Sequence, residues 1–147
     1  MSTYQKALEI ATFAHNGQKR WNGSPYINHP IEVSNMVNTE EEKIVALLHD
    51  TLEDCADKVG PKTFIIEGFS DNVINAIFVI TKSPAENYLS YILRVKANNI
   101  SRIVKMADLT HNLSDLDAKH HKSMKDKYEL AYYILSHKTQ NEGVLNV

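Results

Sequence analysis

Cysteine, glycine, proline and long apolar runs are all scarce in this chain of 147 residues. The single cysteine, Cys55, rules out an internal disulfide and also a structural zinc site built from several thiolates. With 5 glycines and 4 prolines, the composition differs from that of low-complexity or disordered segments. No segment approaches the roughly 18 consecutive apolar residues that a membrane-spanning helix needs, so we expect no membrane association.

An excess of basic residues is missing as well. The formal net charge is −2 with the 7 histidines counted as neutral, whereas a protein bound to nucleic acid mainly through phosphates carries a basic excess. We therefore expect no nucleic-acid partner. The first residues, Met1 to Lys6, lead into an amphipathic stretch and do not resemble a signal peptide, so the cytoplasm is the expected location. The oligomeric state is left open.

What the chain does contain is the composition of a folded domain. Hydrophobic residues make up 43% and charged residues 23%, so we expect one globular domain over residues 1–147. Apolar residues recur at helical spacing in successive segments, and no alternating run of β-branched residues lies between hairpin turns. We therefore predict an all-α fold of about seven or eight helices.

Caps and breakers delimit these helices. Gly17 ends a first helix, Pro30 begins a second, and Thr39-x-x-Glu42 has the form of a capping box at the start of a third. The third helix is apolar on most sides, so it should be central, and we predict that it runs into the segment 46–54. Further helices are expected over 61–68, from a cap at Ser70 to about 81, over 85–97, from a cap at Ser101 to about 116 and over 123–137, with a tail at 139–147.

A cluster of polar residues interrupts this central helix. The apolar run 46–48 leads directly into His49 and Asp50, and Glu53 and Asp54 follow within about one helical turn. Burying so many polar groups is costly unless they are satisfied. Imidazole and carboxylate together suit divalent first-row ions such as manganese, iron, cobalt or zinc.

Two ligands are too few to hold such an ion. His29, near the start of the second predicted helix, and Asp108, within a later apolar helix, are the further candidates. Simpler explanations exist for each residue. His29 could be an ordinary residue at the start of a helix, and Asp108 could form an ion pair with Lys105 on its own helix. These explanations require several independent polar intrusions into core helices, whereas one metal site accounts for all of them, so we favour the metal site.

Four motifs, in order, resemble those of the HD superfamily of metal-dependent phosphohydrolases, and in particular the hydrolase domain of RelA/SpoT homologues. The resemblance extends from His15 to about Leu116 and is closest to free-standing small alarmone hydrolases. The motifs are Ala14-His15-x-Gly17-Gln18, Arg20-x-x-Gly23-x-Pro25-Tyr26-Ile27-x-His29-Pro30, His49-Asp50-x-x-Glu53-Asp54 and Val104-Lys105-x-Ala107-Asp108-x-x-His111-Asn112.

The resemblance implies an HD-domain helical bundle that hydrolyses the 3′-pyrophosphate of (p)ppGpp to GDP or GTP and pyrophosphate, with one Mn²⁺ ion per chain. It implies that Glu53 and Asp54 act on the attacking water, by orienting it or taking its proton. A solvated helix end is the simpler explanation of this acidic pair, but acidic groups near a helix C-terminus oppose the macrodipole, which favours a function. The implied metal ligands are His29, His49, Asp50 and Asp108.

Substrate contacts follow from the same resemblance. Arg20 matches a residue that packs against the nucleotide base, a natural role for a planar guanidinium. Asn112 would touch ribose or phosphate, and Lys105 is a further candidate. Lys82 and Tyr128 would contact phosphate and the distal end of the substrate, although surface or packing roles explain these two equally well. His111 would support the site from outside the ligand set or simply pack.

Two departures from the family pattern bear on the substrate. Trp21 stands where the family usually has a basic residue, and the segment after Leu116 is hard to align. Three alternatives therefore stay open beside (p)ppGpp: (p)ppApp, NADPH or another nucleotide as substrate, and a catalytically silent domain that binds an alarmone. A catalytically silent domain is disfavoured because the acidic pair and all four predicted ligands are present.

Overall fold

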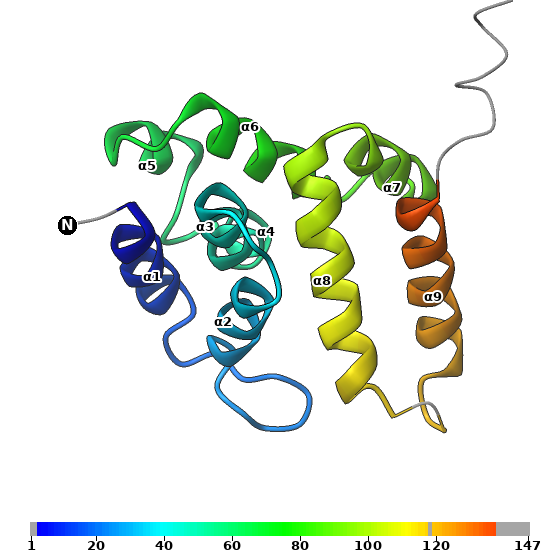
Figure 1. Cartoon of the computed structure of the whole chain (residues 1–147). Coiled ribbons are helices and arrows are strands. Elements are labelled where there is room, and N and C mark those ends of the chain that lie inside the picture. Colours follow the sequence, from blue (N-terminus) through cyan, green and yellow to red (C-terminus); the bar gives the residue numbers. More distant parts are fainter. Residues whose placement is uncertain (1–2, 118, 138–147) are drawn as a thin grey trace, which may run out of the picture.

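The computed structural model describes residues 3–117 and 119–137, which form nine helical segments joined by loops (Figure 1). Apart from an isolated β-bridge between Lys19 and Pro25, this part of the chain contains no strand, so the predicted all-α fold is confirmed. No helix among the described residues combines the length and apolar character needed to cross a membrane. The predicted tail at 139–147 lies outside the described residues.

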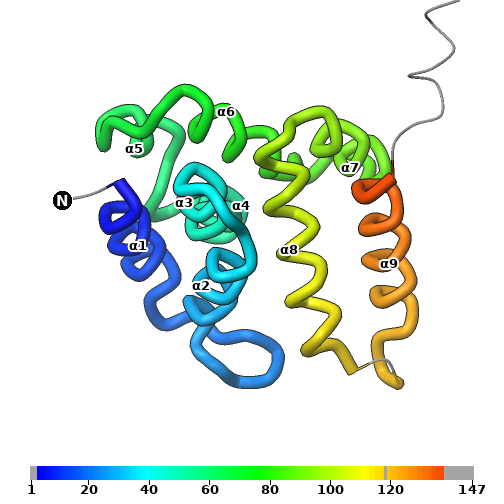
Figure 2. Tube along the Cα trace, in the orientation of Figure 1, coloured from blue at the N-terminus to red at the C-terminus, as the bar shows by residue number. Residues whose placement is uncertain are grey.

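The central helix is α3 (Glu40–Leu48), as expected from its apolar sequence. It begins with the predicted capping box: the Thr39 hydroxyl accepts the Glu42 N–H at 3.1 Å, and the Glu42 carboxylate accepts the Thr39 N–H at 3.1 Å. Residues 44–48 of α3 are all buried. Figures 1 and 2 show how its neighbours surround it, namely α1 (Thr3–Ala14), α2 (Asn28–Asn35), α6 (Asp71–Ile80) and α8 (Asn99–Asp115).

The predicted helices recur with shifted ends. Because α2 begins at Asn28 and not at Pro30, His29 lies inside its first turn. Predicted helix 85–97 begins only at Tyr88, because the Asn87 side chain accepts the N–H groups of Leu89 and Ser90 as an N-cap. The remaining helices are α4 (Thr51–Asp54), α5 (Pro61–Ile66), α7 (Tyr88–Lys96) and α9 (Lys122–Ser136).

Two apolar clusters form the core, and α8 belongs to both. Val104 and Ala107 pack into the larger cluster with α1, α2, α3 and α6, whereas Leu109 packs into a smaller one with α7 and α9. Asp108 lies between these residues on α8 and is itself buried. A buried carboxylate between two apolar clusters needs polar partners, which locates the polar site of the molecule.

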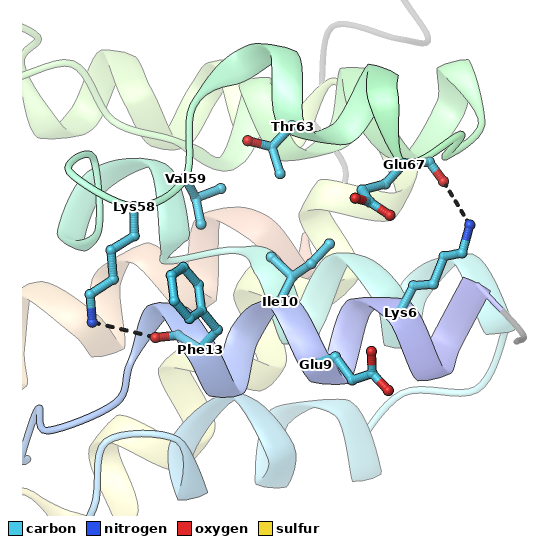
Figure 3. A pocket seen from close by; sticks show the side chains of 8 residues that line it. All are labelled: Lys6, Glu9, Ile10, Phe13, Lys58, Val59, Thr63 and Glu67. Carbon is cyan, nitrogen blue, oxygen red and sulfur yellow. Dashed lines mark hydrogen bonds between the residues drawn. The ribbon is translucent and has the colours of Figure 1, made fainter.

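A groove of about 380 Å³ between α1 and the segment 58–67 lies apart from the predicted site residues (Figure 3). Its apolar wall includes Ile10 and Val59. Lys6 Nζ donates to the Glu67 carbonyl at 3.3 Å, and Lys58 Nζ donates to the Phe13 carbonyl at 3.4 Å. None of the residues predicted to bind metal or substrate lines this groove.

The start of α8 corrects one prediction. Ser101 does not cap this helix; Asn98 does, because its side-chain oxygen accepts the Ser101 N–H at 2.9 Å. The Ser101 hydroxyl instead donates to the Ala76 carbonyl at 2.8 Å, and Ser101 is completely buried. Ser101 therefore ties α8 to α6, a long-range role that its local sequence does not reveal.

We predict that Asn98→Ala lowers the free energy of unfolding by about 1 kcal/mol, because it removes the N-cap hydrogen bond of α8. Asn98→Asp keeps a side-chain acceptor and should retain most of the stability. Urea denaturation of the three proteins measures the difference. Equal losses in both variants would show that the cap does not stabilise the helix through this acceptor.

Candidate metal and substrate site

The site forms where the central helix breaks. The prediction of a continuous helix into segment 46–54 is wrong, because α3 ends at Leu48 and α4 begins at Thr51. His49 Nδ1 lies 2.6 Å from the Ala46 carbonyl, and the Thr51 hydroxyl donates to the Leu48 carbonyl at 2.8 Å. Side chains thus satisfy carbonyls of the last turn, and the chain turns at His49 and Asp50.

The His49 ring is oriented for a cation. A carbonyl can only accept, so Nδ1 carries a hydrogen and donates to Ala46, which leaves the Nε2 lone pair free in the neutral ring. Nε2 is buried and has no hydrogen-bond partner among the described residues. It lies 3.1 Å from Asp50 Oδ2 and 3.3 Å from Asp108 Oδ1, both of them acceptors. Burial lowers the pKa of His49, but Asp50 and Asp108 outweigh burial and raise it, so this point attracts positive charge.

All four predicted ligands converge here. His29 Nε2 lies 2.8 Å from Asp108 Oδ1 and 3.7 Å from Asp50 Oδ2. Ligand atoms of His29, His49 and Asp50 lie within 4.8 Å of one another, which is a possible metal-binding cluster. The donors come from α2, from the α3–α4 junction and from α8. Two imidazole nitrogens and two carboxylates fit a divalent first-row ion.

Neighbouring side chains form hydrogen bonds with His29 and Asp108. His29 Nδ1 and His111 Nδ1 are 2.7 Å apart, so one ring donates to the other, which is the supporting role considered for His111. Asp108 Oδ2 accepts from Lys105 Nζ at 2.8 Å, and Asp108 Oδ1 accepts from Asn112 at 3.1 Å. Such partners fix the orientation of ligand side chains.

Sequence reasoning missed Tyr26 as a member of the site. Its hydroxyl donates to Asp50 Oδ2 at 2.6 Å and lies 3.4 Å from Asp54 Oδ2. Burial and the charge of Asp50 raise the pKa of Tyr26, so the phenol stays protonated and serves as a donor. The residue stands within one of the quoted motifs, but nothing in its spacing indicated this contact.

The predicted catalytic carboxylates lie on α4 next to the cluster. Glu53 Oε1 accepts the backbone N–H of Lys82, and Glu53 borders the cleft described below. Partial burial, followed by the charge of Asp50, raises the pKa of the Asp54 carboxyl. Burial also raises the pKa of Glu53, although the Lys82 N–H opposes the shift. A carboxylate with a raised pKa is a better proton acceptor.

A mainly polar cleft of about 300 Å³ opens beside the ligands, a size suited to part of a small molecule. Loop 17–26, α2, the α3–α4 segment, α8 and α9 all contribute to its wall. Among the predicted substrate residues, the lining includes Arg20, Lys105, Asn112 and Tyr128. The complete lining is Lys19, Arg20, Trp21, Tyr26, His29, Asp50, Glu53, Lys105, Asp108, Asn112 and Tyr128.

Arg20 differs from an ordinary exposed arginine of a loop. It is buried, and its Nη2 lies 3.3 Å from both Asn112 Oδ1 and Asp115 Oδ2, to which it donates. Its guanidinium carbon lies 4.8 Å from the centre of the Trp21 ring, in cation–π contact. Trp21 itself is 54% exposed, so part of its indole ring is accessible to solvent at the cleft.

Lys82 is the one predicted substrate residue outside the cleft lining. Its Nζ donates to the Ser83 carbonyl at 3.1 Å, and its contact with the site is made by the backbone N–H that binds Glu53. Lys19 and Trp21 line the cleft although neither was chosen as a binding residue from the sequence.

Comparisons with known proteins give relatives of much greater length. No protein-family profile matches the chain. It is 35% identical over 127 residues to a guanosine-3′,5′-bis(diphosphate) 3′-pyrophosphohydrolase of Borreliella burgdorferi, covering 76% of this chain and 18% of that protein. It is 33% identical over 150 residues to a protein of the same name from Aquifex aeolicus, covering 91% and 21%. A GTP pyrophosphokinase of Myxococcus xanthus is 30% identical over 131 residues, covering 77% and 17%. The chain thus spans about a fifth of these relatives' length.

A solved structure described as a metazoan orthologue of SpoT that hydrolyses ppGpp has the same fold. The TM-score is 0.77 at 20% identity, covering 98% of this chain and 91% of that one. The helical bundle therefore has the HD-domain fold, and two histidines and two aspartates lie close together within it. Over a domain-sized region the chain is similar to RelA/SpoT homologues, as its motifs predicted.

We predict that Asp50→Ala abolishes metal binding, because it removes one ligand and leaves His49 Nε2 facing a single carboxylate. Elemental analysis of protein loaded with Mn²⁺ should fall from about one ion per chain to near zero. Asp57→Ala, which removes an exposed carboxylate three residues beyond Asp54, is the matched control and should keep its metal. Full metal content in a folded Asp50→Ala protein would contradict the ligand assignment.

Proposed function

We propose that this chain is a metal-dependent hydrolase that converts (p)ppGpp to GDP or GTP and pyrophosphate. The observation that carries the proposal is the convergence of His29, His49, Asp50 and Asp108 at the wall of a polar cleft. The same cleft holds the carboxylate of Glu53. Relatives named for this reaction add support, although the chain covers about a fifth of their length.

We infer that the resident ion is a single Mn²⁺. Two imidazoles and two carboxylates form a donor set that manganese accepts, and the free lone pair of buried His49 Nε2 needs such a partner. When bound, a divalent ion polarises a phosphoryl oxygen and lowers the pKa of a coordinated water. Tyr26, Lys105, Asn112 and His111 keep the ligand side chains in position.

Glu53 is the proposed general base. The Lys82 N–H binds Oε1, and Oε2 has no hydrogen bond or ion pair within the described part of the chain, so Oε2 is the oxygen available to take a proton from water. Asp54 is the second carboxylate, and its Oδ2 near the Tyr26 hydroxyl would orient the water rather than accept its proton. This division matches the cleft, which Glu53 lines and Asp54 does not.

The cleft supplies positive charge for the phosphates of the substrate. Lys19, Arg20 and Lys105 line it, and Lys105 is already held by Asp108. Asn112 links Arg20 to Asp108, so it lies between the proposed base-binding region and the metal ligands. Tyr128 of α9 also lines the cleft. Lys82 would have to leave the Ser83 carbonyl before its ammonium could reach a phosphate.

We predict that Glu53→Gln keeps its metal and loses turnover by at least about a hundredfold, because an amide cannot take the proton from water. The glutamine oxygen can still accept the Lys82 N–H, so geometry is retained while basicity is lost. Metal content and pyrophosphate release are measured on the same preparation. Turnover close to that of the native protein would remove Glu53 from the role of base.

A second candidate substrate is the adenine alarmone (p)ppApp. The observation that keeps it is the exposed Trp21 ring beside Arg20, because any purine can stack on an indole surface.

We predict pyrophosphate release from ppGpp when ppGpp, ppApp and NADPH are compared side by side with Mn²⁺. Trp21→Lys should shift the ratio of kcat/KM between ppGpp and ppApp, whereas Phe13→Lys, at an exposed aromatic outside the cleft, should not. Binding of an alarmone with no product from any of the three would identify a silent alarmone-binding domain instead.

A further inference from the structure

Helix α7 follows α6 in the chain (Figure 1). Two side chains of α7 bind the C-terminal end of α6. A helix leaves its last carbonyls without intrahelical partners. Here Arg94 Nη1 donates to the Val79 carbonyl at 2.7 Å, and Arg94 Nη2 donates to the Thr81 carbonyl at 3.2 Å. The Tyr91 hydroxyl donates to the carbonyl between them, that of Ile80. We call Arg94 and Tyr91 the α6 clamp.

The clamp reaches Glu53 through one peptide group. The Thr81 carbonyl, which Arg94 binds, and the Lys82 N–H, which Glu53 Oε1 accepts, belong to the same planar unit. Their oxygen and hydrogen point in opposite directions because the peptide is trans. Arg94 therefore holds one end of this peptide while its other end holds the carboxylate of Glu53.

The Arg94 guanidinium also forms an ion pair on the surface, in addition to its contacts with the α6 carbonyls. Its Nε lies 3.0 Å from Glu86 Oε2 and its Nη2 lies 2.9 Å from Glu86 Oε1, a two-point ion pair. Glu86 lies in the loop between α6 and α7. An exposed ion pair alone contributes little to stability, so the carbonyl contacts distinguish Arg94 from an ordinary surface arginine.

We propose that Arg94, through the Thr81–Lys82 peptide, is a positioning residue that orients the Glu53 carboxylate toward the reacting water. This inference rests on the proposed function, because it takes Glu53 as the base. Because the peptide N–H binds Oε1, it restricts the rotation of the carboxylate and so the direction of Oε2. Without Arg94 the peptide can rotate, and the carboxylate loses the orientation on which proton transfer depends.

Three substitutions test the kinetic consequence. Arg94→Gln should lower kcat by about tenfold or more and leave KM nearly unchanged, because it misaligns a base without touching the substrate. Arg94→Lys retains one donor for a carbonyl and should recover part of the loss. Glu86→Gln breaks the ion pair but keeps both carbonyl contacts, so its kcat should stay within about twofold of native. Equal losses in Arg94→Gln and Glu86→Gln would overturn the proposal in favour of a surface ion pair.

A second measurement needs no catalysis and covers the case of an unstable variant. In the metal-free full chain, the ¹H–¹⁵N shift of the Lys82 amide should titrate with the Glu53 carboxyl, because that carboxylate accepts the Lys82 N–H, and partial burial should place this titration above the pKa of an ordinary glutamate. Glu53→Gln should abolish this titration, and Arg94→Gln should reduce its amplitude. Arg102→Gln, which removes an arginine whose described contacts lie within α8, is the control and should leave it intact.

The two measurements separate the two hypotheses. A native protein that hydrolyses no alarmone, yet shows a Lys82 titration weakened by Arg94→Gln, refutes the proposed function and retains the coupling of Arg94 to Glu53. A native protein that hydrolyses ppGpp, with kcat and Lys82 titration both unchanged in Arg94→Gln, retains the function and refutes the positioning role.

Discussion

The burial of Asp108 is the constraint on which the rest of the structure depends. Its carboxylate lies on α8 between two apolar clusters, where an unpaired charge would be strongly unfavourable. Lys105 and Asn112 satisfy it from its own helix, while His29 reaches it from α2 and His49 from the end of α3. The packing of α2 and α3 against α8 thus assembles a set of metal-type ligands as it buries the core.

The proposed metal ligands lie on helices and the turn between α3 and α4, whereas several residues of the cleft lie in a loop. The proposed metal ligands belong to packed helices and to the short turn between α3 and α4, so their positions are tied to the core. Arg20, Trp21 and Tyr26 belong to loop 17–26, which is ordered by backbone hydrogen bonds such as Arg20 N–H to the Ser24 carbonyl at 2.9 Å. Substitutions in that loop would alter the proposed nucleotide contacts and leave the proposed metal ligands unchanged.

Glu53 and Asp54 are adjacent carboxylates with different surroundings, which is why we propose different roles for them. Glu53 borders the cleft and is held by a backbone N–H from the α6–α7 connection, whereas Asp54 lies beside the Tyr26 hydroxyl. The elements that hold Glu53 are far from it in sequence: Lys82 follows α6, and Arg94 belongs to α7. The single turn α4, which carries the proposed catalytic pair, therefore contacts the connection between two other helices.

Local rules were sufficient for the all-α class and the Thr39 capping box, because capping and apolar spacing depend on neighbours within a turn or two. They failed where a distant partner competes. The break at His49, the cap at Asn98 with Ser101 bound to Ala76, and the burial of Arg20 all depend on groups brought together by packing. The sequence by itself determined which histidines and carboxylates are available to bind a metal. Only the tertiary structure decided how they face one another, since hydrogen bonds between separate helices exist only once those helices have packed.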